Sequence, residues 1–408
     1  MSSDWQAGKL GDFIELKRGY DLPASKRANG GYPLISSSGE SDCHNEFKVH
    51  GPGVVTGRYG TIGKVFFVEN NFWPLNTTLY VRDFKGNDPR FVSYFLKTID
   101  FMAFSDKAAV PGVNRNHLHE ASAVIPDLVT QKKIASFLNA LDDQITLLRE
   151  TNETLEAIAQ AIFKSWFVDF DPVKAKAAGL VPGGIDEATA ALFPDSFDGP
   201  IPSGWSGRTI GDVTAVMGGS TPDTKSPEYW QPAEFNWTSP KDLSGLNSPV
   251  LLDTDRKISS AGLAKISSGL LPVGTLLLSS RAPIGYLAIS QIPIAINQGY
   301  IAMPPGGKLP PLYLYFWCKQ NMEEIKSRSN GSTFMEISKS AFRPIPTVLP
   351  SSNIIAAFMS VVGVLFEEIV AQQEEIKTLS ELRDTLLPRL ISGKLKLPET
   401  TQEAVEMA

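Results

Sequence analysis

The chain has 408 residues, of which 42% are hydrophobic and 20% are charged, as in ordinary soluble proteins of two or three domains. Its two cysteines, Cys43 and Cys318, exclude a disulfide framework and a cysteine-based metal site, and they favour a reducing compartment. No apolar signal core opens the sequence, and the longest apolar run, residues 354–366, is too short to cross a bilayer. We therefore expect a cytoplasmic protein that does not enter a membrane.

The net charge of −6 is unevenly distributed along the chain. The acidic excess lies in residues 169–200 and 351–408, whereas residues 1–129 are neutral and residues 201–350 are basic. The overall charge therefore does not exclude a local basic groove, although it argues against strong nonspecific binding to nucleic acid.

The first region, residues 1–129, is predicted to be rich in β-strands. "GVVTGRYG", "KVFFVE" and "TLYVRDF" are typical of short strands separated by glycine and proline turns. A short helix is expected near residues 90–97, followed by a strand in "AVIPDL".

A long helix follows, over residues 130–170. Apolar residues recur alternately every three and four positions from Ile134 to Trp166, which is the pattern of a coiled coil. Pro172 cannot continue this helix, so an acidic linker rich in alanine, glycine and proline is expected over residues 171–200.

The second region, residues 201–350, repeats the first. The offset between matching residues grows from 200 to about 222, which indicates an insertion within "DLSGLNSPVLLDTDRK" of the second copy. A second heptad helix is expected over residues 351–395, followed by a tail over residues 396–408. The matching positions are Gly11-Asp12 with Gly211-Asp212, Gly19 with Gly219, Ile62-Gly63 with Ile284-Gly285, and Asn76 with Asn297.

Each heptad seam contains one polar residue near its middle, Asn152 in the first helix and Gln372 in the second. If the helices pack antiparallel, their midpoints meet, and the two side chains would form a buried polar layer that fixes the register. The alternative is two unrelated irregularities exposed to solvent.

The known catalytic patterns are missing. Gly57, Gly60, Gly63 and Lys64 imitate a phosphate-binding loop, but a strand follows them where such a loop needs a helix. "DFDPVKAK" imitates a nuclease pattern but lies in the linker without a counterpart in the other copy. The spacing of His117 and His119 would suit a metal on a strand, although ordinary surface or core histidines are the favoured interpretation. We expect neither a catalytic nor a metal site.

At this level the chain resembles the DNA-specificity subunits of type I restriction–modification systems over almost its whole length. The resemblance rests on the repeat and on the segments "AIFKSWFVDFDPVKAKAAG", "IPDLVTQKKIASFLNALDDQI", "GSTFMEIS" and "LLPRLISGKL". The family usually has Glu-Gln before each helix, whereas this chain has Thr130-Gln131 and Ser352-Asn353.

The resemblance implies an α+β fold with an internal pseudo-twofold repeat. Residues 1–129 and 201–350 would be two target recognition domains, joined by two long antiparallel coiled-coil helices, and each would read half of a split double-stranded DNA target. The chain itself would be non-catalytic and hold no cofactor. Two modification subunits would use S-adenosylmethionine to methylate adenine N6, and two restriction subunits using ATP and Mg could join them.

A helix of about 35 residues is about 52 Å long, and duplex turns repeat about every 34–36 Å, so the helices could act as a molecular ruler between half-sites. Two other interpretations stay open: a coiled-coil scaffold whose β-domains bind protein or carbohydrate, and a nuclease acting through "DFDPVKAK".

Residues able to read DNA carry arginine, lysine, amide or hydroxyl groups on loops. Trp166, Phe167 and Phe170 are candidates for docking a modification subunit, with core packing as the alternative. Lys48, Lys225 and Lys241 are candidates for phosphate contacts. The candidates for base contacts are Arg58, Tyr59, Thr61, Lys64, Asn76, Thr77, Thr78, Asn114, Arg115 and Asn116 in the first region, and Ser280, Arg281, Asn297, Gln298, Tyr300, Arg328, Asn330, Ser332 and Thr333 in the second.

Overall fold

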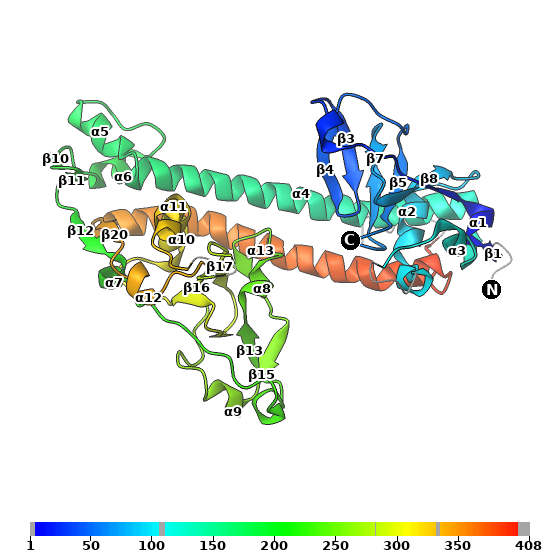
Figure 1. Ribbon diagram of the computed structural model, residues 1–408. Coiled ribbons are helices and arrows are strands. Elements are labelled where there is room, and N and C mark those ends of the chain that lie inside the picture. The colour runs from blue at the N-terminus through cyan, green and yellow to red at the C-terminus, as the bar shows by residue number, and fades with distance from the viewer. Residues whose placement is uncertain (1–4, 106–110, 282, 332–334, 399–408) are drawn as a thin grey trace. The chain divides into compact units, whose positions relative to one another are not determined.

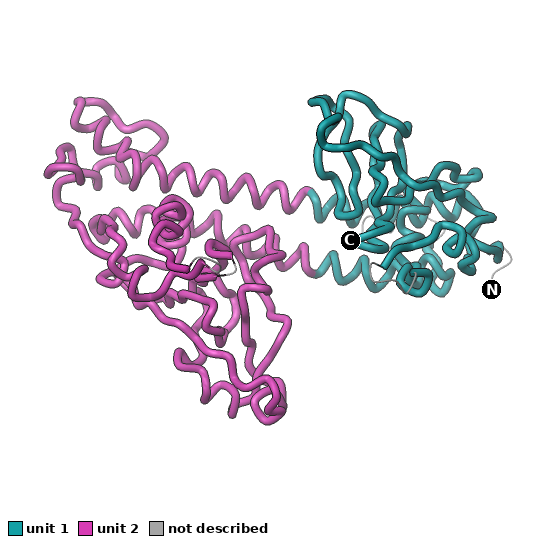
Figure 2. The backbone as a smooth tube through the Cα atoms, viewed as in Figure 1, with its two compact units in different colours: residues 1–146, 378–408 teal, residues 147–377 magenta. Residues whose placement is uncertain are grey.

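Two helices of 40 residues each, α4 (Leu128–Phe167) and α13 (Ser352–Ile391), dominate the computed structural model (Figure 1). The structure describes residues 5–105, 111–281, 283–331 and 335–398. The chain divides into two compact units, unit 1 (residues 1–146 and 378–408) and unit 2 (residues 147–377), coloured separately in Figure 2. The division cuts through both helices, so each unit consists of one β-rich domain with part of α4 and part of α13.

Within each unit the helices run antiparallel, as the family resemblance implied. In unit 1 the beginning of α4 packs with the end of α13, because Leu138 and Leu390 belong to one core and are both fully buried. In unit 2 the end of α4 packs with the beginning of α13, where the rings of Phe163 and Phe358 lie 5.9 Å apart. The 3.5-residue spacing thus keeps one apolar seam buried along each helix.

Among the described residues, α13 is the one helix long and apolar enough to cross a membrane by length and composition. Its apolar side chains are used within the protein: Phe358 and Val362 are fully buried in unit 2, and Leu390 is fully buried in unit 1. The heptad seam therefore accounts for part of the apolar composition of α13.

The described residues of domain 1, the β-rich part of unit 1, form three sheets. An antiparallel sheet has the order β2-β8-β5-β6, a second has the order β4-β3-β7 with β3 and β7 parallel, and β1 pairs with β9. Helix α2 packs on β5 and β6. The elements are β1 (Trp5–Lys9), α1 (Leu10–Phe13), β2 (Glu15–Arg18), β3 (Tyr32–Ser36), β4 (Gly39–His44), β5 (Gly53–Gly57), β6 (Val65–Val68), β7 (Trp73–Pro74), β8 (Thr78–Asp83), α2 (Pro89–Lys97), α3 (Arg115–His119) and β9 (Ser122–Pro126).

Domain 2, the β-rich part of unit 2, repeats this plan. Strands β19-β16-β17 correspond to β8-β5-β6, strands β15-β13-β18 correspond to β4-β3-β7, and β12 pairs with β20. The elements are β12 (Ser206–Thr209), α7 (Ile210–Val213), β13 (Phe235–Thr238), α8 (Pro240–Leu243), β14 (Val250–Leu251), β15 (Arg256–Ile258), α9 (Ser260–Leu263), β16 (Leu276–Ser279), β17 (Leu287–Ser290), β18 (Ala295–Ile296), β19 (Tyr300–Met303), α10 (Pro311–Gln320), α11 (Met322–Ser327), α12 (Lys339–Phe342) and β20 (Pro346–Leu349).

The predicted insertion in domain 2 forms α8 and β14, which have no counterpart in domain 1. Strand β14 joins the four-stranded sheet as a parallel neighbour of β17. The insertion therefore adds an edge strand beside β17, whereas at the opposite edge the pairing of β2 with β8 is reduced in domain 2 to an isolated bridge between Met217 and Ala302.

Backbone hydrogen bonds correct one match between the copies. In each domain the residue directly after the parallel strand β7 or β18 donates its N–H to the neighbouring strand; this residue is Leu75 in domain 1 and Asn297 in domain 2. The structural offset is therefore 222, and Asn76 corresponds to Gln298. The sequence match of Asn76 with Asn297 was wrong by one residue, because it favoured identity over register.

The matched glycines Gly19 and Gly219 are explained by a close backbone approach. A Cβ on Gly19 would lie 2.2 Å from the carbonyl oxygen of Leu75, and one on Gly219 would lie 1.8 Å from that of Ile296. Any side chain at either position would force the two segments apart.

The segment between the copies is more ordered than the predicted linker. It forms helices α5 (Asp171–Ala177) and α6 (Glu187–Leu192) and the short strands β10 (Phe197–Asp198) and β11 (Ile201–Pro202). Helix α4 ends before Pro172, as predicted, and Pro172 lies in the first turn of α5, where a missing N–H is tolerated.

Candidate nucleic-acid interface

Three arginines meet in one pocket of domain 1. This arginine pocket, of about 320 Å³, is formed by Arg18, Arg58, Tyr59, Leu79, Gly112, Val113, Asn114 and Arg115. The N–H of Val113 donates to the carbonyl of Arg58 at 3.0 Å, which joins the loop after β5 to the start of α3. The guanidinium of Arg58 lies over the ring of Tyr59, 4.5 Å from its centroid. The structure thus brings four predicted residues together and adds Arg18, which the sequence did not single out.

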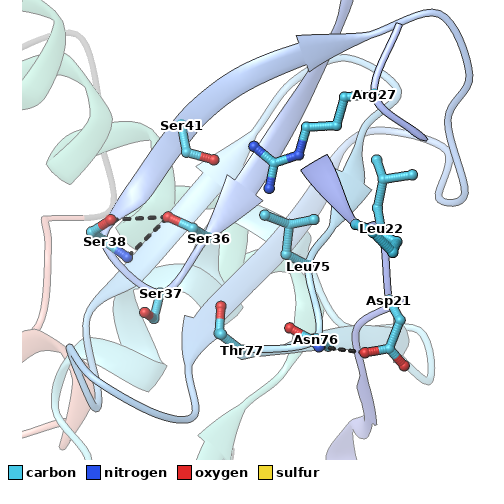
Figure 3. A pocket seen from close by; sticks show the side chains of 11 residues that line it. Asp21, Leu22, Arg27, Ser36, Ser37, Ser38, Ser41, Leu75, Asn76 and Thr77 are labelled. Carbon is cyan, nitrogen blue, oxygen red and sulfur yellow. Dashed lines mark hydrogen bonds between the residues drawn. The ribbon is translucent and has the colours of Figure 1, made fainter. Parts of the chain in front are cut away.

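A second pocket of domain 1, of about 450 Å³, is lined mostly by hydroxyl and amide groups (Figure 3). This amide pocket is formed where the chain leaves β2, in the β3–β4 turn and in the β7–β8 turn. Within it the Nδ2 group of Asn76 donates to the carboxylate of Asp21. Its lining residues are Asp21, Leu22, Pro23, Arg27, Ser36, Ser37, Ser38, Ser41, Leu75, Asn76 and Thr77.

The two pockets adjoin. The N–H groups of Arg58 and Tyr59 donate to the carbonyl of Thr77 at 2.9 and 3.2 Å. Arg18 also forms an ion pair with Asp21 at 3.2 Å. Cationic groups suited to phosphate thus lie beside amide and hydroxyl groups suited to base edges.

The remaining candidate DNA-contacting residues of domain 1 include both exposed and buried side chains. Thr61, Lys64 and Asn116 are exposed. Thr78 is fully buried, and its hydroxyl donates to the carbonyl of Leu75 at 2.7 Å, so the predicted DNA contact by Thr78 is corrected to a structural role. Lys48 is exposed and lies 4.6 Å from the ring centroid of Trp73.

In domain 2 the side chains around the equivalent turn are held by neighbours. The exposed Gln298 accepts a hydrogen bond at its Oε1 from the Thr221 hydroxyl at 2.7 Å. Asn297 accepts one from the N–H of Gly299 at 2.8 Å and so stabilises the turn. Arg281 lies 3.7 Å from the carboxylate of Glu336.

Two candidates of domain 2 are buried and are corrected to structural roles. Tyr300 and Ser280 are each 2% exposed. The Tyr300 hydroxyl donates to the carbonyl of Ser239 at 2.6 Å, and burial raises the pKa of Tyr300. All four residues of β19 are buried, so neither side of this strand leaves Tyr300 free for DNA, and Ser280 directly follows the fully buried strand β16.

The remaining candidates of domain 2 lie in loops and at helix ends. Arg328 pairs with Glu324 at 2.7 Å, and Lys241 lies 3.4 Å from Asp255. Lys225 and Asn330 are exposed. Ser332 and Thr333 lie outside the described residues.

The predicted docking cluster is a core. Trp166 is 4% exposed and Phe167 is 7% exposed, and their rings contact the ring of Phe358. Phe170 is half-buried against Trp205. Because these rings bury one another within unit 2, the packing alternative describes them, and the docking prediction is corrected.

The amide of Asn152 is 5% exposed, and neither its oxygen nor its nitrogen has a hydrogen-bond partner. The Gln372 amide donates to Glu368 at 2.7 Å, and its Oε1 is buried without a partner. No hydrogen bond therefore joins Asn152 to Gln372, and a register-fixing role for this pair stays a prediction.

Lys176 of the nuclease-like segment "DFDPVKAK" and His119 of the histidine pair form hydrogen bonds within the protein. Lys176 donates to the carbonyl of Ala190 at 3.2 Å and so caps α6. His119 lies on helix α3 rather than on a strand, and its Nε2 accepts from the N–H of Leu16 at 2.9 Å. Within residues 5–105, 111–281, 283–331 and 335–398, no three side chains of metal-binding type gather.

A polar cluster ties domain 1 to both helices within unit 1. Asp142 of α4 accepts hydrogen bonds from the Tyr94 hydroxyl of α2 and from Arg383 of α13, each at 2.6 Å. Burial opposes the charge of Asp142, but the hydrogen bonds from Tyr94 and Arg383 outweigh it and hold the pKa of Asp142 below its ordinary value. Burial lowers the pKa of the neighbouring Lys97.

Domain 2 is tied to α4 by a related cluster within unit 2. Glu156 of α4 accepts from the Tyr315 hydroxyl of α10 at 2.5 Å and forms an ion pair with Lys319. In each unit a tyrosine from the short helix of the domain thus reaches a carboxylate on α4.

The model of the type I restriction modification DNA specificity domain matches residues 2–157 and 202–387. The chain belongs to this family. The family assignment confirms the resemblance seen in the sequence and accounts for the two copies, because the matched segments coincide with the two domains and the helices that follow them.

Relatives support this assignment over the whole length of the chain. The chain is 27% identical to the HindI specificity subunit of Haemophilus influenzae over 461 residues, covering 96% of this chain and 100% of the relative. It is 35% identical to the MjaIX specificity subunit of Methanocaldococcus jannaschii over 193 residues, covering 46% of this chain and 44% of the relative.

A solved structure shares the fold. The S subunit of a type I restriction–modification system from M. genitalium aligns with a TM-score of 0.59 and 18% identity, covering 98% of each chain. The predicted α+β architecture with an internal repeat and two long helices is therefore confirmed, and family membership supports a role in DNA recognition.

Proposed function

We propose that this specificity subunit reads a bipartite DNA target, with domain 1 contacting one half-site and domain 2 the other. The observation that carries the proposal is the arginine pocket beside the amide pocket in domain 1. Arg18, Arg58 and Arg115 supply the charge that duplex phosphates need, and the adjoining Asn76 supplies groups that base edges recognise.

The two half-sites are proposed to differ in sequence. By the offset of 222, Arg58 and Tyr59 of domain 1 correspond to Ser280 and Arg281 of domain 2, so the equivalent loops present different chemistry. Two divergent readers in one chain favour an asymmetric target, whereas two identical subunits would favour a palindrome.

The helix pair is proposed to set the gap between the half-sites. Helices of 40 residues are about 60 Å long at 1.5 Å per residue, against a duplex repeat of about 34–36 Å. The gap would then depend on helix length rather than on base contacts.

The chain is proposed to act without catalysis of its own, in the cytoplasm, by placing partner subunits on DNA. Two modification subunits would bring S-adenosylmethionine and adenine-N6 methylation, and restriction subunits would bring ATP and Mg. Family membership supports this division of labour, and so do the structural roles of Lys176 and His119.

The test is a methylation map. The chain is co-expressed with the modification subunit encoded beside it, and N6-methyladenine is mapped across the host genome. We expect one split motif with a fixed gap, and replacement of residues 1–129 by another relative's domain should change one half only. An intact, partner-bound complex that leaves no motif would overturn the proposal and favour a scaffold that binds protein or carbohydrate.

A further inference from the structure

The equivalent side-chain amides of the two domains, Asn76 and Gln298, are held through different atoms: Asn76 through its nitrogen and Gln298 through its oxygen. Tyr20 in domain 1 and Ser220 in domain 2 make the same backbone hydrogen bond, to the last residue of β7 and of β18. The next residues, Asp21 and Thr221, are therefore equivalent. Each contacts the equivalent amide: Asp21 accepts from the nitrogen of Asn76, whereas Thr221 donates to the oxygen of Gln298.

Asp21 fixes which way the Asn76 amide faces. A carboxylate has only acceptor atoms, so the amide nitrogen must point toward it; the reversed amide would place two oxygens against each other. Figure 3 shows this contact among the side chains that line the amide pocket. Within the part of the chain that the structure describes, Asn76 makes no other side-chain hydrogen bond, so its Oδ1 and its second N–H stay available.

The free edge of Asn76 suits one base in particular. An acceptor and a donor on one asparagine pair with N6 and N7 of adenine in the major groove, whereas guanine offers only acceptors there. Because Asp21 prevents the amide from flipping, Asn76 could offer two N–H donors to guanine only by breaking its hydrogen bond to Asp21.

The Thr221 hydroxyl imposes no such orientation. A hydroxyl both donates and accepts, so the Gln298 amide keeps a hydrogen bond to Thr221 in either orientation. The equivalent position of domain 2 is therefore more tolerant of different bases.

We propose that Asn76 reads one adenine in the half-site of domain 1 and that Asp21 is the positioning residue that enforces this choice. The inference rests on the proposed DNA-reading function. It predicts a strict A·T pair opposite Asn76 and weaker discrimination at the position opposite Gln298.

The test uses the complex of this chain with its modification subunit. The half-sites come from the methylation map of the unaltered complex. Binding is then measured to duplexes in which each base pair of the motif is exchanged in turn, with the methylated adenine left unchanged. The readout is the ratio of affinities for the original and the exchanged duplex, since Asp21 also neutralises Arg18 and its loss would strengthen nonspecific phosphate binding.

We expect Asn76→Ala to reduce discrimination at a single A·T position by roughly tenfold to a hundredfold. Asp21→Ala and Asp21→Thr should relax the same position, because the first frees the amide and the second copies domain 2. Asp21→Glu, which keeps the acceptor-only partner, should retain more discrimination than either. Thr221→Ala is the matched control and should leave the half-site of domain 1 unchanged.

Three results would overturn the inference. In the first, Asn76→Ala leaves discrimination unchanged at every position of the motif. In the second, the position at which Asn76→Ala reduces discrimination is a G·C pair. In the third, Asn76→Ala abolishes discrimination at an A·T pair but Asp21→Ala leaves the affinity ratio at that pair unchanged. Unaltered melting temperatures of the variants exclude misfolding as the cause. Failure of the proposed function looks different, because the unaltered complex would then yield no motif at all.

Discussion

Replacing Asp142 by asparagine should destabilise unit 1 by about 2 kcal/mol at neutral pH. The carboxylate accepts two hydrogen bonds of 2.6 Å, from Tyr94 and from Arg383, and its replacement leaves both with a weaker partner. Removing one partner of a fully buried ion pair costs about 3–5 kcal/mol. The side chains of Asp142 and Arg383 are 29% and 24% exposed, so solvent replaces part of the lost interaction and the smaller value applies.

The assay is denaturant unfolding followed by a double-mutant cycle with Tyr94→Phe. The coupling between Tyr94 and Asp142 should be about 1.5 kcal/mol, the lower end of the range for a hydrogen bond to a charged group. The matched control is Asp143→Asn: Asp143 is the next residue of α4 and is exposed, so its replacement should change stability by less than about 0.5 kcal/mol.

The effect must also depend on pH. The folded-state pKa of Asp142 lies below its ordinary value, so the stabilisation is complete above that ordinary value and is lost as the pH falls through the lowered folded-state pKa. The unaltered protein should therefore approach the stability of Asp142→Asn in strong acid. A stability difference independent of pH, or equal loss from Asp143→Asn, would refute the reasoning.

Three further perturbations follow from single contacts. Asn152→Leu should raise the free energy of unfolding by about 1 kcal/mol, because it removes a buried amide without partners; a destabilised variant in denaturant titration would show that the amide is satisfied after all. Gly19→Ala should destabilise unit 1 by roughly 2 kcal/mol or more, because the new Cβ would lie 2.2 Å from the Leu75 carbonyl oxygen and the backbone would have to move to relieve the clash. An unchanged melting temperature would contradict this expectation. Arg115→Ala should weaken binding to all duplexes alike and lower the slope of log K against log salt by about 0.9, whereas an effect confined to one sequence would point to base reading.

The helices and the repeat were predictable because their signals are periodic. Heptads extending over 40 residues can be satisfied only by burying one seam, and Leu138 and Phe358 lie fully buried in it. Position within a strand was harder, since the polar side chains of Thr78 and Tyr300 turned inward and found backbone carbonyls as partners.

The site was only partly visible in the sequence. Arg58, Tyr59, Asn114 and Arg115 were found because their side chains are typical of DNA contacts, and folding brings them into one pocket. Asp21 was missed because a carboxylate repels DNA when considered alone. Its importance depends on the amide beside it, which lies 55 residues away in the chain.

The strand added by the insertion has a consequence for solubility. Strand β14 covers the edge of β17, and its Val250 and Leu251 are 1% and 2% exposed. In domain 1 the equivalent strand, β6, is itself the edge of its sheet among the described residues, and the Arg90 guanidinium lies 3.9 Å from the ring centroid of Phe67 on that strand. An open strand edge is a template for pairing with other chains. Removing the insertion from domain 2 would therefore expose the apolar edge of β17 without supplying an arginine such as Arg90, which lies beside β6. We expect the shortened protein to aggregate before it loses DNA recognition.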